Sequence, residues 1–363
     1  MTLFGNAFQP HLIGESGAKP VTHFIKMDEI QLTQESLAAY LAAHGLVRNP
    51  VGLSIRELGG GVSNFVSLIE GPGIRWVAKQ SLGKLRVKDD WTSQRERIFR
   101  EAAVIQSLGS ILDGAVPQVV HVDRANFLYL MTAAPPGSVV WKDSLLNGNI
   151  DLEVAEAAGR LLATMITSSQ QVPSFQEQFA DRTVFDELRI DPYYRTAAGR
   201  NQDARKALEE LIEDSWKIRN SLVHGDYSPK NMLVRGDSIF LIDFEVVHWG
   251  DPAFDSAFLV NHLMLKSFYQ PCYAEGYFQA CHAFWQALMS GLRNARTEDF
   301  EGMTVRHLGG LMLARMDGKS PVEYIRDEGI KSRVRRTAKH LLAKRPREFK
   351  DAVAIVERAV AEP

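Results

Sequence analysis

Apolar and polar positions alternate in three short runs after residue 50, at residues 53–58, 64–70 and 74–80. Alternation with a period of two is typical of strands that bury one face. A run of three glycines at 59–61 separates the first two runs, and a Gly-Pro-Gly turn at 71–73 separates the second from the third. The pattern therefore predicts three antiparallel strands with a glycine loop between the first two.

Helical spacing appears before and after these strands. Thr33 is a predicted N-cap for a helix that Gly45 ends. Residues 93–108 place apolar side chains on one helical face and charges on the other. Two further strands are predicted at 118–123 and 126–132.

A Pro-Pro-Gly break at residues 135–137 marks the predicted boundary between two lobes. We expect a lead-in at 1–30, a strand-rich lobe at 31–133 and a mainly helical lobe at 134–363. This arrangement belongs to the α+β fold class. The predicted helical runs of the second lobe are 152–166, 204–218, 258–284 and 349–360.

Composition and charge narrow the class of protein. With 363 residues, 45% of them hydrophobic and 24% charged, the chain is long enough for two lobes and is not low in complexity. The formal charge of -2 disfavours a nucleic-acid binder driven by bulk positive charge. Eight of the seventeen residues from Lys331 to Arg347 are Lys or Arg, so the rest of the chain is acidic. Such a block is typical of an anion-binding surface or a solvated helix face.

Two cysteines, Cys272 and Cys281, provide neither a disulfide framework nor a zinc site, which fits a reducing compartment. We expect both thiols to be buried. The first twenty residues lack the basic and apolar regions of a secretory signal, and no run reaches the roughly 20 apolar residues of a membrane span. A cytoplasmic protein without a membrane partner is therefore expected.

The richest candidate chemistry lies between residues 224 and 245. His224-Gly225-Asp226 is followed after five positions by Asn231, then by a strand, a Gly-Asp turn and a second strand that ends at Asp243. A hairpin would bring Asp226, Asn231, Asp243 and Glu245 around one space. Oxygen-bearing side chains in one pocket suit Mg²⁺.

Either Asp-containing triplet alone is typical of a loop turn with an aspartate cap. Together, at a D-x-x-x-x-N spacing followed by D-F-x, they favour phosphoryl transfer of the protein-kinase type. In that chemistry Asp226 accepts the proton of the attacking hydroxyl, while Asn231 and Asp243 hold the metal.

The strand-rich lobe supplies the complementary parts of such a site. Lys79 ends the third strand, and Glu101 lies on the following helix, with Glu96 as a competing partner for the lysine. Glycines in the loop would let backbone amides approach phosphate oxygens without an intervening Cβ. The predicted phosphate loop consists of Gly59, Gly60, Gly61, Ser63 and Asn64.

In these motifs, and in the catalytic-loop segment HGDYSPKN, the sequence resembles the aminoglycoside phosphotransferase and choline kinase-like superfamily. The resemblance covers the chain from about residue 50. It implies a protein-kinase-like fold of two lobes, with ATP in the cleft between them. The adenine would lie on the linker near Met131 to Ala133.

Several segments look more specifically like the 5-methylthioribose kinases, among them SNFVSLI, MTAAPPGSVVWKDSLLNG and FDELRIDPYY. This likeness implies that Asp243 and Glu245 both serve Mg²⁺. It also implies that a loop around Trp91 closes near the site, and that Arg335 and Arg336 meet the substrate and the transferred phosphate. Lobe packing for Trp91 and a solvated basic helix for the two arginines remain the alternatives.

The sequence thus predicts an ATP-dependent kinase that phosphorylates a hydroxyl of a sugar or sugar-like alcohol, with 5-methylthioribose as a leading acceptor. Aminoglycoside, choline-type amino-alcohol and homoserine-type acceptors stay open. A nucleotide-binding scaffold protein without catalysis is the alternative from another class. The sequence does not decide between a monomer and a homodimer.

Overall fold

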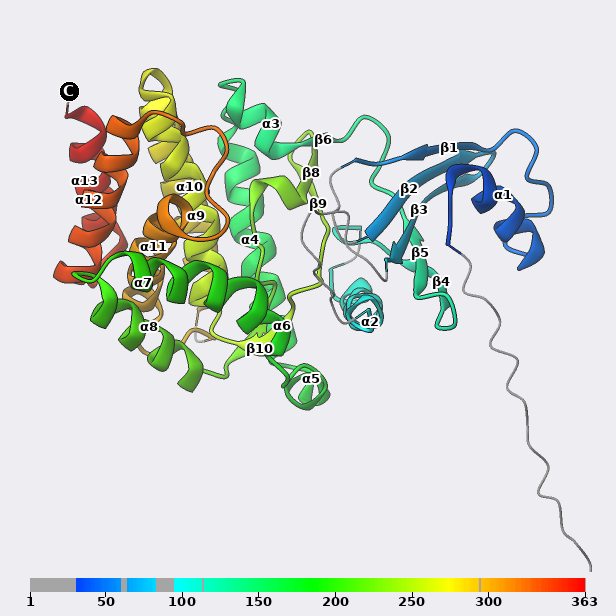
Figure 1. Cartoon of the computed structure of the whole chain (residues 1–363), viewed down its shortest axis with the longest axis horizontal. Coiled ribbons are helices and arrows are strands. Elements are labelled where there is room, and N and C mark those ends of the chain that lie inside the picture. The colour runs from blue at the N-terminus through cyan, green and yellow to red at the C-terminus, as the bar shows by residue number, and fades with distance from the viewer. Residues whose placement is uncertain (1–30, 60–63, 83–94, 113, 294, 363) are drawn as a thin grey trace, which may run out of the picture. The chain divides into compact units, whose positions relative to one another are not determined.

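Five antiparallel strands form the sheet predicted for the first part of the chain (Figure 1). The computed structural model describes residues 31–59, 64–82, 95–112, 114–293 and 295–362. The order of strands across the sheet is β1-β2-β3-β5-β4. Their bounds are β1 Ser54–Glu57, β2 Asn64–Gly71, β3 Ile74–Ser81, β4 Val119–Asp123 and β5 Leu128–Thr132.

Each face of this sheet packs against one helix. On β2, Phe65 and Ile69 point to the side that α1 (Gln34–Ala43) covers, where they form a small apolar cluster. Leu68 belongs to the opposite side, which α2 (Arg97–Gly109) covers and which is continuous with the core of the helical region. The alternation read from the sequence is therefore the alternation between two buried faces.

The predicted cap of the first helix is confirmed. The Thr33 side chain accepts a hydrogen bond from the Ser36 amide, and the Ser36 hydroxyl accepts one from the Thr33 amide, so the two residues form a capping box. The second helix begins in the structure at Arg97, while its predicted start at Ser93 lies outside the described residues.

The remainder of the chain is mainly helical, as predicted (Figure 1). Its longer α-helices are α4 Leu152–Ser169, α8 Arg205–Lys217, α9 Ala253–Tyr269, α10 Ala274–Leu292, α11 Phe300–Asp317, α12 Glu328–Lys344 and α13 Phe349–Ala361. Shorter ones are α3 Trp141–Leu146, α5 Pro173–Gln178, α6 Thr183–Phe185 and α7 Thr196–Arg200, with a π-helix at Asp186–Arg195 between α6 and α7. Among the described residues, no helix is long and apolar enough to cross a membrane.

The core of the helical region is built around α9, in which every residue from Ala253 to Phe268 is buried. Helices α4 and α10 pack closely against each other because Gly159 has no side chain. A Cβ at that position would lie 2.3 Å from the backbone oxygen of Phe284. The glycine therefore sets the distance between the two helices.

Short strands position the loops that carry the candidate chemistry. The hairpin β8 Met232–Arg235 and β9 Ser238–Leu241 pairs with β6 Val139–Val140, and β7 Ser221–Val223 pairs with β10 His248–Gly250. The second hairpin strand ends at Leu241, two residues before the predicted end at Asp243. Asp243 has a φ of +71°, in the left-handed region that a strand cannot contain.

The expectation of two buried thiols was wrong for one of them. Cys281 is buried in α10, whereas Cys272 is exposed. Cys272 lies in the short turn Pro271–Tyr273 that separates α9 from α10, and this turn contains no buried residue. Burial raises the pKa of the Cys281 thiol above its ordinary value, which keeps it protonated.

Replacing Gly159 by alanine is expected to destabilise the protein by about 1–3 kcal/mol, because the added Cβ overpacks the contact between α4 and α10. Gly199→Ala in α7 is the matched control, since a Cβ there meets no atom within 4 Å. The control should be neutral or stabilising by up to about 1 kcal/mol. Urea unfolding measures both, and equal effects at the two sites would contradict the packing argument.

Candidate active site

Lys79 on β3 contacts two carboxylates, that of Glu101 on α2 beside the sheet and that of Asp243 in the turn after β9. Its Nζ donates to Glu101 Oε1 at 2.9 Å and lies 3.1 Å from Asp243 Oδ1. Glu101, rather than Glu96, is thus the helix partner of the lysine. Both Lys79 and Glu101 are buried. Burial disfavours the charge of Lys79, but the two carboxylates raise its pKa well above the ordinary value, so the ammonium is retained.

The backbone of the segment His224-Gly225-Asp226 is held in place by a carboxylate on α9. Asp255 accepts hydrogen bonds from the backbone amides of His224 at 2.6 Å and Gly225 at 2.9 Å. Gly225 has a φ of +76°, and a Cβ there would lie 2.7 Å from the Val246 side chain. Only glycine combines a positive φ with the absence of a Cβ, so it suits this position. The turn at Gly225 thereby fixes the direction of the next side chain, that of Asp226.

His224 is a structural link rather than a base in this arrangement. Its Nδ1 accepts a hydrogen bond from the Asp226 amide at 3.2 Å, so its Nε2 carries the proton and donates to the Ile242 carbonyl at 3.1 Å. Burial lowers the pKa of His224 to about 4, which keeps the ring neutral. The two bonds connect the loop to the chain just before Asp243.

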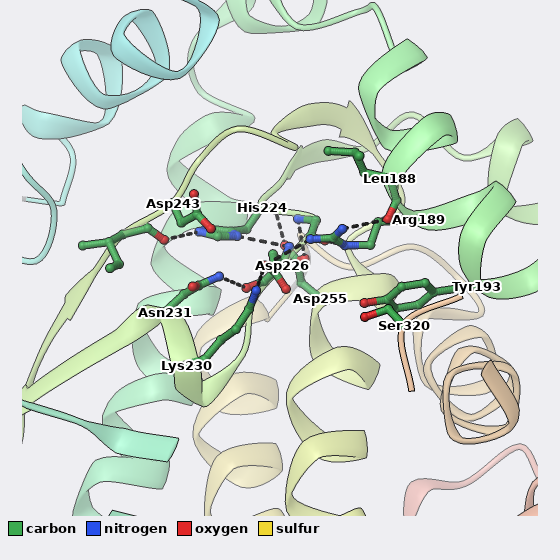
Figure 2. Close-up of polar contacts among 12 residues, drawn as sticks. Leu188, Arg189, Tyr193, His224, Asp226, Lys230, Asn231, Asp243, Asp255 and Ser320 are labelled. Carbon is green, nitrogen blue, oxygen red and sulfur yellow. Dashed lines mark hydrogen bonds and ion pairs between the residues drawn. The ribbon is translucent and has the colours of Figure 1, made fainter. Parts of the chain in front are cut away.

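Two cations hold the carboxylate of Asp226 (Figure 2). Arg189 Nη2 lies 3.1 Å and Lys230 Nζ 2.7 Å from Asp226 Oδ2. The side-chain Nδ2 of Asn231 donates to the Asp226 backbone oxygen at 2.9 Å. Burial opposes ionisation of Asp226, but Arg189 and Lys230 reverse the balance and hold its pKa well below the ordinary range. Asp226 is therefore a charged but weakly basic group.

Arg189 itself is fixed by two backbone oxygens. Its Nε donates to the Gly225 carbonyl at 2.6 Å and its Nη1 to the Leu188 carbonyl at 2.7 Å (Figure 2). The arginine comes from the π-helix, whose wide turns contain Pro192. A π-helical stretch is often found at functional sites.

Two cavities meet at this point. One, of about 400 Å³, is lined by Lys79, Glu101, Asn231 and Asp243, and the other, of about 420 Å³, by Asp226 and Arg189. Lys230 and Glu245 line both, so they form the shared boundary. The four oxygen-bearing residues predicted to surround one space are thus divided between two adjoining cavities, because Asp226 faces away from Asn231 and Asp243 into the second one.

The first cavity collects most of the residues predicted to bind the nucleotide. They are Gly59, Asn64, Lys79, Glu101, Met131 and Ala133, and an apolar wall adds Val66, Val77, Leu233, Phe240 and Ile242. An apolar slot beside a buried lysine suits a flat base attached to phosphates. Gly60, Gly61, Ser63 and Trp91 lie outside the described residues.

The predicted metal ligands fit a hard cation in part. Asn231, Asp243 and Glu245 line the same cavity, and Glu245 Oε2 is buried without a hydrogen-bond partner, 3.8 Å from Arg97 Nε. Within the described ranges, no cluster of three or more His, Cys, Asp or Glu side chains forms a metal site from protein groups alone. Two carboxylates and an amide match the usual pattern for Mg²⁺, in which water and phosphate oxygens complete the shell.

Arg335 and Arg336 are not brought to either cavity, so the expectation that they contact the substrate is not supported. Arg335 Nε instead lies 2.9 Å from Asp317 Oδ1, and Arg336 is 67% exposed and 3.7 Å from Glu362. The basic block forms α12, whose charged face is turned outward. The second cavity is lined by two other arginines, Arg189 on the π-helix and Arg315 on α11.

The sequence motifs missed several cavity residues, including Arg189, Lys230, Lys266 and Arg315. Lys230 could have been found, because it precedes Asn231 in the candidate loop. Arg189 lies in the segment FDELRIDPYY, where a proline inside a helical run was a usable signal. Lys266 and Arg315 belong to long helices and carry no local signal.

A family model described as the phosphotransferase enzyme family matches residues 54–289, which is more than half of the chain. The chain belongs to the phosphotransferase enzyme family. This membership confirms the superfamily that the motifs predicted. The matched residues include the lysine of β3, its glutamate partner and the segment from His224 to Glu245.

Curated relatives of this phosphotransferase-family chain include methylthioribose kinase 2 of Oryza sativa subsp. japonica, which is 28% identical over 277 residues. The alignment covers 67% of this chain and 65% of that relative. Methylthioribose kinase of Escherichia coli is 26% identical over 276 residues, covering 66% of this chain and 65% of the relative. The chain thus spans somewhat less than two thirds of the length of these relatives.

Among solved structures, the GDP complex of an aminoglycoside 2'-phosphotransferase-IIIa mutant superposes with a TM-score of 0.51 at 13% sequence identity. The match covers 86% of this chain and 97% of that one. At this identity the likeness concerns the fold alone. It confirms the predicted protein-kinase-like α+β fold for this member of the phosphotransferase family.

Lys266 provides a pH-dependent test of the second cavity. Burial, aided by the nearby positive charges of Lys142 and Arg315, lowers its pKa from 10.5 to about 7. The unfolded chain therefore binds more protons between these values, so this lysine's destabilising effect is complete below about pH 7 and fades as the pH rises towards 10.5.

Lys266→Met should accordingly stabilise the protein by a few kcal/mol at pH 6 and by much less at pH 9. Thermal unfolding at the two pH values measures the difference, with Lys206→Met, at a 90% exposed side chain, as control. A stabilisation that is the same at both pH values would contradict the lowered pKa.

Proposed function

We propose that the protein is an ATP-dependent small-molecule kinase that transfers the γ-phosphoryl group to a hydroxyl of a sugar or sugar-like alcohol. The observation that carries the proposal is the pair of adjoining cavities, one with the buried lysine and the candidate metal ligands, the other with Asp226. Phosphoryl transfer needs a nucleotide and an acceptor on opposite sides of the moving group. The shared boundary at Lys230 and Glu245 is a suitable position for that group.

On the nucleotide side, Lys79 would bind the α- and β-phosphates while Glu101 keeps its ammonium in place. In the structure Lys79 also contacts Asp243. Asn231, Asp243 and Glu245 would hold Mg²⁺, which supplies positive charge to the phosphate oxygens when bound. Adenine would occupy the apolar slot beside Met131 and Ala133.

On the acceptor side, Asp226 would orient the attacking hydroxyl and accept its proton. The two cations on its carboxylate make it a weak base, which suits a loose transition state in which the proton leaves late. Its contribution would thus come from positioning more than from base strength. Lys230, at the boundary between the cavities, can balance charge on the transferred group.

The methylthioribose kinases among the relatives support a pentose-like alcohol as the acceptor class. Amino alcohols, aminoglycosides and homoserine-type acceptors are the competing classes, and a silent nucleotide-binding scaffold is the competing function. A turnover screen with Mg²⁺ and ATP over these acceptors, read by ADP release and product mass, separates them. Binding of MgATP without turnover on any acceptor would favour the scaffold.

Asp226→Asn should lower kcat by at least about 100-fold, because the amide neither orients the attacking hydroxyl as the carboxylate does nor accepts its proton. The dissociation constant for nucleotide should stay within about threefold, since Asp226 does not line the nucleotide cavity. Asp237→Asn, in the exposed turn between β8 and β9, is the matched control and should leave both constants unchanged. Near-full turnover of Asp226→Asn would remove Asp226 from the mechanism.

A further inference from the structure

One end of the proposed acceptor cavity carries two buried cations and a buried hydroxyl, and among the described residues neither cation forms an ion pair with a carboxylate. The residues concerned are Lys266 on α9, Arg315 on α11, and Tyr324 in the segment that follows α11. All three line the cavity of Asp226, and none lines the nucleotide cavity. The charges of Lys266 and Arg315 therefore face the proposed acceptor cavity rather than the nucleotide cavity.

Arg315 is 9% exposed and is oriented by neutral groups only. Its Nη1 donates to the Tyr193 hydroxyl at 3.2 Å and to the Ser320 hydroxyl at 3.0 Å, two residues labelled in Figure 2. Its Nε is buried and has no hydrogen-bond partner. The same Nη1 also donates to the Ser320 carbonyl, and in the part of the chain that the structure describes Arg315 forms no ion pair with a carboxylate. A fixed, buried and unpaired guanidinium is the kind of group that binds an anion.

Lys266 is fully buried and is also held by neutral groups. Its Nζ donates to the His262 backbone oxygen at 3.0 Å and lies 5.4 Å from the centre of the Tyr324 ring. The Tyr324 hydroxyl is buried without a hydrogen-bond partner. Burial lowers the pKa of His262 well below its ordinary value, so this neighbour is neutral. Below about pH 7, where Lys266 is protonated, the pocket end thus offers two cationic donors and one hydroxyl donor.

The remaining charges of the cavity lining are either paired or exposed among the described residues. The pairs are Asp226 with Arg189 and Lys230, Glu323 with Lys142, Asp191 with Lys319, and Glu245 with Arg97. Glu187 is exposed. Glu323 acts on Lys266 and Arg315 from a distance, but its exposed carboxylate is paired with Lys142. Among the described residues, no lining carboxylate forms an ion pair with Lys266 or Arg315.

Two like charges buried together without an ion-pair partner destabilise the folded protein. That cost is recovered when a ligand brings the missing negative charge. We propose that the acceptor is an alcohol bearing an anionic group, a carboxylate or a phosphate, which binds between Lys266 and Arg315 while its hydroxyl faces Asp226. This inference rests on the proposed kinase function and narrows its substrate class.

The proposal separates this chain from kinases of neutral or cationic acceptors. Methylthioribose is uncharged and would leave both cations unneutralised. A cationic aminoglycoside or choline-like alcohol would be repelled by them. The Tyr193 and Tyr324 rings provide apolar surface beside the charges, so an acceptor with a carbon skeleton between its hydroxyl and its anionic group fits the lining.

Matched acceptor series test the inference: ribose, ribonate and ribose 5-phosphate, then glucose, gluconate and glucose 6-phosphate, with methylthioribose and choline as uncharged and cationic references. Binding is measured by calorimetry without ATP, and turnover by ADP release and product mass. In at least one series the anionic member should bind at least tenfold more tightly than its neutral parent. Preference for the acid or the phosphate ester identifies the anionic group.

Lys266→Met and Arg315→Gln should each weaken binding of the preferred anionic probe by tenfold or more and leave the nucleotide dissociation constant unchanged. The matched controls are Lys206→Met and Arg160→Gln, at exposed side chains outside both cavities. Thermal unfolding of each variant guards against loss of fold, and Lys266→Met removes a buried charge and so should remain folded. Weakened nucleotide binding in either variant would overturn the assignment.

The outcomes distinguish this inference from the proposed function. Phosphorylation of methylthioribose or another neutral alcohol at least as efficient as that of every anionic probe would overturn the anionic acceptor and leave the kinase standing. Charge-dependent binding of an anionic probe without phosphorylation of any acceptor would count against the kinase and leave the charge complementarity standing. Tight binding of choline would overturn the charge argument.

Discussion

The buried ammonium of Lys79 is the interaction on which the rest of the site depends. It links β3 of the sheet, α2 through Glu101, and the turn after β9 through Asp243. A buried lysine keeps its charge only beside carboxylates, so the three elements must stay together for the charge to be tolerated. The same charge is what a nucleotide would use, because phosphate oxygens can replace Asp243 as its partner.

A second constraint acts on the loop that carries Asp226. Asp255 on α9 accepts hydrogen bonds from the loop backbone, and Gly225 supplies the left-handed turn. Arg189 donates to the Gly225 carbonyl and pairs with the Asp226 carboxylate. The result is a rigid aspartate whose charge is stabilised and whose basicity is reduced. Such a group is suited to orienting a hydroxyl for a phosphoryl transfer in which proton removal is a late event. The acceptor cavity beyond it differs from the nucleotide cavity in its surplus of buried cations.

Much of the fold could be predicted because the spacing of apolar residues along a segment shows which face of a strand or helix is buried. The strands at residues 64–70 and 74–80 and the Thr33 cap needed only their own neighbourhoods, and all are confirmed. The pairing of Lys79 with Glu101 was predictable from the order of motifs. The likeness to the methylthioribose kinases implied that Arg335 meets the substrate, yet Arg335 pairs with Asp317. Both thiols were expected to be buried, yet Cys272 lies in an exposed turn. The ion-pair partner of Arg335 and the exposure of Cys272 both depend on how distant segments pack, so neither could be read from the neighbouring sequence.

The sequence by itself determined the α+β class, the phosphotransferase motifs and the residues around Lys79 and Asp226, because each depends on spacing along one segment. Apart from the pairing of Lys79 with Glu101, only the tertiary structure decided how the charges of the site are partnered. Arg189 meets Asp226 across thirty-seven positions of chain. Lys266 and Arg315 line one cavity from two helices, and in the described part of the chain neither forms an ion pair with a carboxylate. Charges interact through space over a few ångströms, so which cations are neutralised and which remain for a ligand is fixed only when the helices pack.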